Sequence, residues 1–269
     1  MLLSIIIPTK NEEENIARVL NSILKQPSFD PKEIEIIVID NPNTTDATRE
    51  ITRQFPVRLD IIGPERSSQR NQGAKLASGK YICFIDADME FSDHLLGEIV
   101  ANLIPNTAMV LPERIPGNTL FCRALNLEKH YYDGNDLISA ARVFPKTQFM
   151  DLGGFNSEMS SGEDWDLDRR FKANDGVIIH LHQPLYHHEE NIGFFKSIHK
   201  KIYYAQQLKN YSIGVQNEIS PIYRYGLFFS KPLLALTHPI AFTYLIFLKS
   251  FQFGIGAIIF TYHKYVSKI

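Results

Sequence analysis

The sequence has little cysteine and no very long uncharged stretch. Two cysteines in 269 residues exclude a disulfide-stabilised scaffold, and Cys83 lies within an apolar run, as expected of a buried thiol. Two uncharged segments near the C-terminus, 232–248 and 250–262, are each shorter than the roughly 20 apolar residues of a simple membrane span. The N-terminal apolar run is too short for a secretory signal before Lys10 and three glutamates follow. We therefore expect the body of the protein in the cytoplasm.

Acidic residues are almost absent from the last part of the chain. From residue 191 onward, nine lysines and arginines stand against one acid, Glu218, although the whole chain has a formal charge of −2. Residues 1–190 are correspondingly acidic. Such a split predicts an acidic body with a basic tail that faces a membrane or another anionic surface, and we expect no nucleic-acid partner. With 44% hydrophobic and 22% charged residues, the chain is too apolar for intrinsic disorder.

The first half of the chain alternates between short apolar runs and segments of helical periodicity. This alternation predicts an open, mostly parallel α/β sheet flanked by helices. The expected strands are 2–7, 34–39, 57–62 and 81–85, and the expected helices are 11–25, 44–55 and 67–77. Later segments predict strands near 108–111 and 139–144, with helices over 119–132 and 163–173. Ligands of such sheets bind beyond the carboxyl ends of the strands, where Pro8, Asp40 and Asp86 lie.

Two carboxylates, Asp86 and Asp88, follow the expected strand 81–85 directly. Side by side they repel each other unless a cation joins them, and a divalent ion that also binds a diphosphate meets that need. An Asp-x-Asp segment after a strand is also a common turn, so the motif alone leaves both interpretations open.

Several motifs occur together in an order that resembles family 2 glycosyltransferases of the GT-A fold. They are Ser4-Ile5-Ile6-Ile7-Pro8, Ile37-Val38-Ile39-Asp40, Arg70-Asn71-Gln72-Gly73, Phe84-Ile85-Asp86-Ala87-Asp88, Gly153-Gly154-Phe155 and Gly162-Glu163-Asp164-Trp165. The resemblance covers residues 2–190. It implies a GT-A catalytic domain over 1–190, divided into a nucleotide-sugar half (1–104) and an acceptor half (105–190).

The resemblance also implies roles for residues on the donor side. Pro8 and Glu12 would border the base and ribose of a nucleotide. Asp40 would accept a hydrogen bond from the base, and Arg70 would contact the base or the diphosphate. Asp86 would contact the nucleotide sugar as well as the metal. The segment after Asp40, 41–45, departs from the Asp-Gly-Ser that family members often carry, so the turn there is left open.

On the acceptor side, Asp164 is the expected catalytic base, and Glu163 would orient it or take its place. The same residues also suit a capping box at a helix N-terminus, and both interpretations can hold together. His187 and His188 are the expected additional metal ligands, since relatives commonly carry a histidine there. Adjacent residues of a strand face opposite ways, so the sequence leaves open which of the two reaches the metal.

These features predict an inverting, metal-dependent glycosyltransferase. It would use Mn²⁺ or Mg²⁺ to move a sugar from a UDP- or GDP-sugar to a hydroxyl of a lipid-linked or membrane-proximal glycan acceptor. One alternative is a polyprenyl-phosphate sugar synthase, whose acceptor phosphate needs no base. A second is a non-catalytic sugar-binding protein on the same scaffold, which would be expected to have lost one of Asp86, Asp88 or Asp164.

The segment 191–269 is expected to be a basic amphipathic and hydrophobic helical region at the cytoplasmic face of a membrane. Within it, apolar residues at helical spacing from Phe195 to Leu208 line one face with the lysines mostly off that face, and an interfacial or re-entrant pair of helices follows over 232–248 and 250–262. The alternative is a helix packed on the protein's own core with a hydrophobic dimer interface behind it. The sequence leaves the oligomeric state open.

Overall fold

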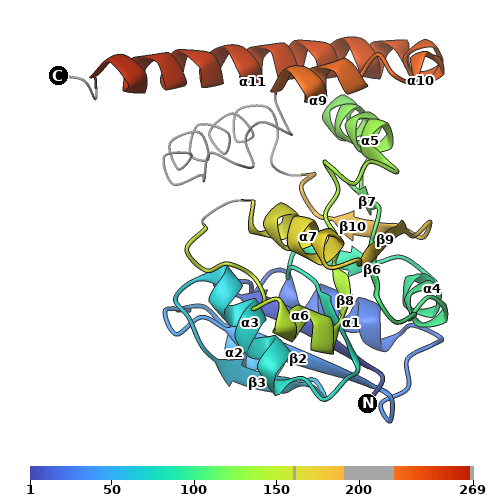
Figure 1. The fold of residues 1–269 in the computed structure, drawn as a ribbon, viewed down its shortest axis with the longest axis vertical. Coiled ribbons are helices and arrows are strands. Elements are labelled where there is room, and N and C mark those ends of the chain that lie inside the picture. Colours follow the sequence, from blue (N-terminus) through green and yellow to red (C-terminus); the bar gives the residue numbers. More distant parts are fainter. Residues whose placement is uncertain (160–161, 191–220, 267–269) are drawn as a thin grey trace. The chain divides into compact units, whose positions relative to one another are not determined.

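The computed structural model describes residues 1–159, 162–190 and 221–266, which form two compact units (Figure 1). The first unit contains Met1–Arg114, Ser139–Glu158 and Glu163–His188. The second contains Ile115–Ile138, Met159–Gly162 and Glu189–Ile269, as far as these residues are described.

The first unit is built on a seven-stranded sheet of order β3-β2-β1-β4-β8-β6-β9. Neighbours among β3, β2, β1 and β4 are parallel, β8 runs antiparallel to β4 and β6, and β9 is parallel to β6. The expectation of a mixed α/β fold with a mainly parallel sheet is confirmed. The strands are β1 (Leu3–Thr9), β2 (Ile34–Asp40), β3 (Arg58–Ile61), β4 (Tyr81–Phe84), β6 (Thr107–Val110), β8 (Val143–Pro145) and β9 (Val177–His180).

Helices cover both faces of this sheet, which explains the unbroken apolar run of β1. Side chains alternate along a strand, so Leu3, Ile5 and Ile7 pack in one core while Ile6 packs in the other. The first core includes residues of α1 and α4, and the second includes residues of α3, α6 and α7. The helices are α1 (Ile16–Leu24), α2 (Thr48–Thr52), α3 (Arg66–Leu76), α4 (Leu95–Ala101), α6 (Lys146–Asp151) and α7 (Glu163–Ala173).

Helix α3 approaches the sheet closely at Gly73. A Cβ atom at this position would lie 2.4 Å from Cγ2 of Ile6. Glycine here therefore lets the helix pack directly on β1, which places the N-terminal half of α3 beside the carboxyl ends of the strands.

A smaller sheet of order β5-β10-β7 completes the first unit. Its strands are β5 (Met89–Phe91), β7 (Glu113–Arg114) and β10 (Leu185–His187). The register pairs His187 with Met89 and Leu185 with Glu113. This pairing brings β10 next to the Asp86–Asp88 segment, which directly precedes β5.

In the second unit, α5 (Leu120–Tyr132) packs against α11 (Pro239–Val266), and α9 (Pro221–Leu227) and α10 (Pro232–Thr237) precede α11. Ala124 and Leu127 of α5 share a small core with Phe228, Ala241 and Leu245. Among the described residues, no helix is both long and apolar enough to cross a membrane.

The structure differs from the sequence expectations in the second half. Helix α5, expected within the catalytic domain, groups with the C-terminal segment. Lys249 does not divide the tail into two helices, because its ammonium pairs with Glu128 of α5 at 2.6 Å and α11 continues through it. The expected basic helix over 195–208 lies outside the described residues.

Candidate active site

The strand order of the first unit indicates where a ligand binds. β1 lies between β2 and β4, and the chain leaves β1 toward β2 and β3 but returns to the opposite side of β1 for β4. In open α/β sheets, the crevice beyond the carboxyl ends of two such strands is the usual binding site. The loops that follow Thr9 and Phe84 lie at this edge of the sheet.

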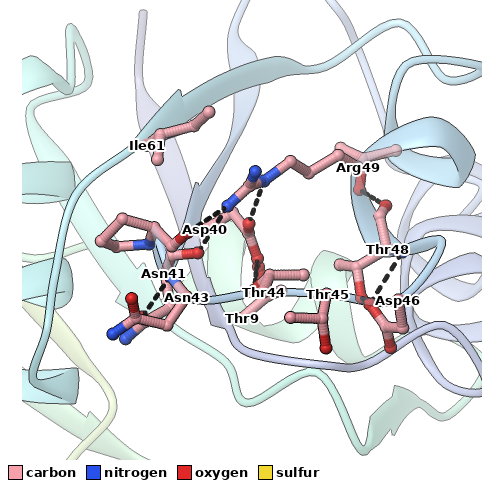
Figure 2. Close-up of polar contacts among 12 residues, drawn as sticks. Thr9, Asp40, Asn41, Asn43, Thr44, Thr45, Asp46, Thr48, Arg49 and Ile61 are labelled. Carbon is pink, nitrogen blue, oxygen red and sulfur yellow. Dashed lines mark hydrogen bonds and ion pairs between the residues drawn. The ribbon is translucent and has the colours of Figure 1, made fainter.

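Asp40, at the end of β2, is fully buried and its carboxylate is occupied by neighbouring side chains (Figure 2). The hydroxyls of Thr9 and Thr44 donate to Oδ1 at 2.7 and 2.9 Å, and Nε of Arg49 donates to Oδ2 at 2.6 Å. Arg49 also donates through Nη2 to the carbonyls of Asn41 and Pro42. Asp40 therefore anchors the turn 41–45 in this structure, and its Oδ2 is already occupied by Arg49.

Hydrogen bonds join the loop after β1 to the loop after β2, and each loop supplies one of the accepting side chains. The carboxylate of Asp46 accepts from the backbone N–H of Glu13 at 3.0 Å and from the hydroxyl and N–H of Thr48. Oδ1 of Asn11 accepts from the N–H of Thr45 at 2.9 Å, and Asn11 adopts a φ of 57°. This network fixes the two loops to each other at the predicted nucleotide end of the sheet edge.

Asp86, just after β4, lies between two arginines. Nη2 of Arg70 is 2.6 Å from Oδ1 and Nη1 of Arg142 is 3.4 Å from Oδ2. Burial by itself raises the pKa of Asp86, but the charges of Arg70, Arg142 and Arg66 outweigh burial and hold the pKa well below its usual range. Asp86 is therefore ionised at neutral pH.

Arg70 also reaches the start of α7, where the predicted catalytic pair lies. Its Nη1 is 3.2 Å from Oδ1 of Asp164 and 3.6 Å from Oε1 of Glu163, and its guanidinium lies 5.3 Å from the ring centre of Phe155. The side chain of Arg70 is only 2% exposed. In this structure Arg70 is a buried link between Asp86 and Asp164 and has little surface left for direct contact with a base.

The two carboxylates of the predicted catalytic pair differ in exposure. Glu163 is 3% exposed and accepts from Nη2 of Arg66 at 2.7 Å, whereas the side chain of Asp164 is 39% exposed. Burial raises the pKa of Asp164, and although nearby arginines oppose this, the charge of Glu163 adds to it and the pKa stays above its ordinary value. Solvent therefore reaches Asp164, whereas Glu163 is enclosed.

The two predicted metal histidines point to different acids. Nε2 of His187 lies 3.1 Å from Oδ2 of Asp88, and its Nδ1 lies 3.7 Å from Oε2 of Glu113. Nε2 of His188 lies 2.7 Å from Glu90 instead. Burial lowers the pKa of His187, but its hydrogen bonds and the charges of Asp88 and Glu113 raise the pKa to about 10. The structure thus brings His187 to Asp88 and turns His188 away.

The remaining predicted donor residues lie on the loop side of β1. Pro8 is buried within the strand, opposite Ile39 in the register. Burial raises the pKa of Glu12, and the charges of Asp88 and Asp86 add to this despite a hydrogen bond from Asn15. Glu12 therefore lies close enough to Asp86 and Asp88 to be affected by their charges.

Three charged residues of this cluster were not predicted from the sequence. Arg142 donates to Oε1 of Glu113 at 2.7 Å and faces Asp86, while Arg66 pairs with Glu163. Arg142 had a local signal, because it interrupts the apolar segment 140–144. Glu113 and Arg66 lie in polar stretches and had none.

The cluster contains side chains of the types that bind a divalent cation, but these side chains are not arranged around one common point. Carboxylate and neutral imidazole are suitable ligands for Mn²⁺, and Asp88 and His187 are already adjacent, but His187 is protonated at neutral pH in this arrangement and would have to release its proton to bind the ion. Both oxygens of Asp86 face arginines, however, and in the described part of the chain no three histidine, cysteine or acidic side chains are gathered in a geometry that could hold a metal ion.

The fold is a mixed α/β fold of the GT-A type. Residues 1–349 of TarS from Staphylococcus aureus superpose with a TM-score of 0.56 at 20% identity, over 78% of this chain and 66% of that one. The mannosyltransferase PcManGT from Pyrobaculum calidifontis superposes with a TM-score of 0.59 at 16% identity, over 99% of this chain and 80% of that one. At these identities the likeness concerns the fold.

The sequence places the chain within that class. Residues 4–139, half of the chain, match the model of glycosyl transferase family 2, and the chain belongs to this family. The expected family is therefore confirmed. The glycosyltransferase AglE of Haloferax volcanii is 37% identical over 92 residues, which are 32% of this chain and 30% of that protein. Full-length TarS of S. aureus is 30% identical over 126 residues, 44% of this chain and 21% of that protein.

The chain thus matches less than a third of the length of either curated relative. The family match includes Asp40, Arg70, Asp86 and Asp88 but ends before Glu163–Ala173. The interpretation of Asp164 therefore rests on its position beside Arg70 and not on the family match.

Proposed function

We propose that this protein transfers a sugar from a nucleoside diphosphate sugar to an acceptor hydroxyl, with inversion at the anomeric carbon. The observation that carries the proposal is that one buried guanidinium, that of Arg70, binds both Asp86 and Asp164. A donor-side carboxylate and a candidate base thereby face the same small volume beyond the carboxyl ends of β1 and β4.

The donor class is supported by what related proteins bind. TarS has been solved with UDP and with UDP-GlcNAc, and PcManGT with GDP-Man and Mn²⁺. In the present chain, the loops after β1 and β2 are tied together by hydrogen bonds at the carboxyl edge of the sheet and carry polar groups that a nucleotide could contact. We extend nucleoside diphosphate sugar binding to this chain as part of the proposal.

Asp164 is suited to act as the general base. As the acceptor oxygen forms its bond to the anomeric carbon, the bond from that carbon to the diphosphate oxygen breaks and the hydroxyl proton passes to Asp164. Its raised pKa and 39% exposure favour proton acceptance from a hydroxyl that enters from solvent. One displacement of this kind inverts the anomeric configuration and needs no covalent intermediate.

Arg66 and the Asp88–His187 pair are suited to bind the leaving diphosphate, the first directly and the pair through a cation. Arg66 is 48% exposed and faces the cluster, so its guanidinium can contact a bound phosphate. Asp88 and His187 would hold a divalent cation that arrives with the nucleotide. When bound, that cation neutralises charge on the departing diphosphate.

The test compares Asp164→Asn with the control Asp151→Asn, which changes an exposed acid at the end of α6. Donor binding is measured by thermal shift with UDP- and GDP-sugars and Mn²⁺, and transfer is measured with oligosaccharide and lipid-linked acceptors. We expect Asp164→Asn to bind donor normally and to lose about 10²–10⁴-fold in kcat, the usual contribution of a general base. The control should lose nothing.

Other results separate the alternatives. Retained kcat in Asp164→Asn would contradict the assignment of the base and favour a phosphate acceptor, which needs none. Absence of nucleotide-sugar binding by the unaltered protein would contradict the proposed function as a whole.

A further inference from the structure

The guanidinium of Arg142 faces two carboxylates at different distances. Its Nη2 is 2.7 Å from Oε1 of Glu113, whereas its Nη1 is 3.4 Å from Oδ2 of Asp86. A charge-assisted hydrogen bond between a guanidinium and a carboxylate measures about 2.7–2.9 Å, so the contact with Glu113 is a full hydrogen bond and the contact with Asp86 is loose. Of the two acids, Glu113 therefore holds the arginine.

The backbone of Arg142 is fixed between two strands of the main sheet. Its N–H donates to the carbonyl of Met109 in β6 at 2.8 Å, and its carbonyl accepts from the N–H of Phe84 in β4 at 2.8 Å. The side chain of Arg142 is only 16% exposed. Only a rotation within the side chain can therefore move the guanidinium from Glu113 toward Asp86.

Glu113 is itself fixed by the small sheet. It lies on β7, where the register pairs it with Leu185 of β10, and the N–H of Leu185 donates to the carbonyl of Pro112 at 2.9 Å. His187 is two residues further along β10, so its side chain lies on the same face of the sheet as that of Glu113. Nδ1 of His187 is 3.7 Å from Oε2 of Glu113. One carboxylate oxygen of Glu113 thus faces His187 and the other binds Arg142.

The two oxygens of Asp86 are occupied to different degrees. Oδ1 accepts from Nη2 of Arg70 at 2.6 Å. Within the described residues, the 3.4 Å approach of Arg142 is the only hydrogen bond or ion pair of Oδ2, and the side chain of Asp86 is 21% exposed. Oδ2 is therefore the less occupied oxygen, and a full hydrogen bond from Arg142 would take it up.

We propose that Glu113 is a positioning residue of the donor site, which keeps the guanidinium of Arg142 off Oδ2 of Asp86 so that this oxygen stays available to the donor. The inference rests on the proposed function, in which Asp86 contacts a nucleoside diphosphate sugar or the cation that it brings. Without Glu113, Asp86 is the one acid of the two that remains, and Arg142 closes on its Oδ2. A donor then has to displace a charge-assisted hydrogen bond.

The test is a double-mutant cycle on the full-length protein. Glu113→Gln and Arg142→Met are made singly and together. Glu90→Gln is the matched control, because Glu90 lies on β5 of the same small sheet and pairs with His188 at 2.7 Å. Affinity for UDP and for GDP in Mn²⁺ is measured by isothermal titration calorimetry, and thermal melting checks that each variant is folded.

We expect Glu113→Gln to weaken binding of the nucleotide by roughly tenfold, the effect of one charge-assisted hydrogen bond that the ligand must displace. In the Arg142→Met background, the same substitution should change affinity by less than about twofold, because the guanidinium that closes on Asp86 is gone. Glu90→Gln should change little. In transfer assays the loss should appear in the KM for the donor more than in kcat. A role in stability alone would lower Tm without this dependence on Arg142.

Should Glu113→Gln fail to fold, Glu113→Asp takes its place, since it keeps the charge but shortens the reach by one methylene, and the same dependence on Arg142 is expected. Normal nucleotide affinity in the Glu113 variant, or equal losses with and without the Arg142 side chain, would overturn the inference alone. An equal loss in Glu90→Gln would also overturn it, because any acid of the small sheet would then have the same effect. Absence of nucleotide binding by the unaltered protein would instead overturn the proposed function, and this inference with it.

Discussion

The buried guanidinium of Arg70 permits a quantitative prediction for the variant Arg70→Met. Methionine keeps much of the side-chain volume but removes the cation shared by Asp86 and Asp164. Removal of one partner from a buried ion pair typically costs about 3–5 kcal/mol, because the remaining charge is left uncompensated.

We expect a cost at the lower end, about 3 kcal/mol. Arg142 remains 3.4 Å from Asp86, Arg66 remains 2.7 Å from Glu163, and the side chains of Asp86 and Asp164 are 21% and 39% exposed. For a domain of this size, that cost corresponds to a fall in Tm of roughly 6–12 °C.

Calorimetry of three variants tests this reasoning. Arg70→Met/Asp86→Asn should be more stable than the sum of the single effects predicts, by about 1–2 kcal/mol, because the second change removes the stranded charge. Arg169→Met is the control, since that arginine is 59% exposed and its pair with Asp166 contributes at most about 1 kcal/mol. A Tm for Arg70→Met close to that of the unaltered protein, or simple additivity in the double variant, would refute the assignment of Arg70 as a charge-compensating link.

Three further predictions concern the metal, the base and the packing of α3. Asp88→Asn should weaken nucleotide-sugar binding in Mn²⁺ by roughly tenfold or more and leave metal-free binding unchanged, and equal titrations of both proteins would contradict a metal role. Because Asp164 accepts a proton only when ionised and its pKa is raised above 3.8, kcat should rise with pH and reach its plateau above the range where an ordinary aspartate titrates; a flat pH profile would contradict it. Gly73→Ala should lower stability by about 1–3 kcal/mol in urea titration, since its Cβ would lie 2.4 Å from Cγ2 of Ile6, and an unchanged midpoint would show that α3 can shift.

The local sequence was sufficient to predict most strands and helices of the first unit. A strand covered on both faces needs apolar side chains at successive positions, so β1, β2 and β4 were visible as continuous runs. Helix α7 begins and ends where its acidic first turn and its periodicity predicted. The positions of Asp40 at the end of β2 and of Asp86 just after β4 followed from the predicted ends of these two strands.

Only the tertiary structure decided how the charges pair. Arg70 and Asp164 are 94 residues apart in the chain, and Arg142 and Asp86 are 56 apart, so no local pattern connects them. The occupation of Asp40 by Arg49 depends on how the short helix α2 turns back over the end of β2. The choice of His187 over His188 at Asp88 depends on which side of the pleat of β10 faces the crevice.

The same distinction holds for the C-terminal part of the chain. Its lack of acids and its apolar runs are properties of composition, which the sequence alone determines. That α11 continues through Lys249 depends on Glu128 of α5, more than a hundred residues earlier, which neutralises that lysine. Which apolar residues are buried and which stay exposed is settled only by the packing of α11 on α5, because a helix that is apolar on every side carries no periodic signal of its own.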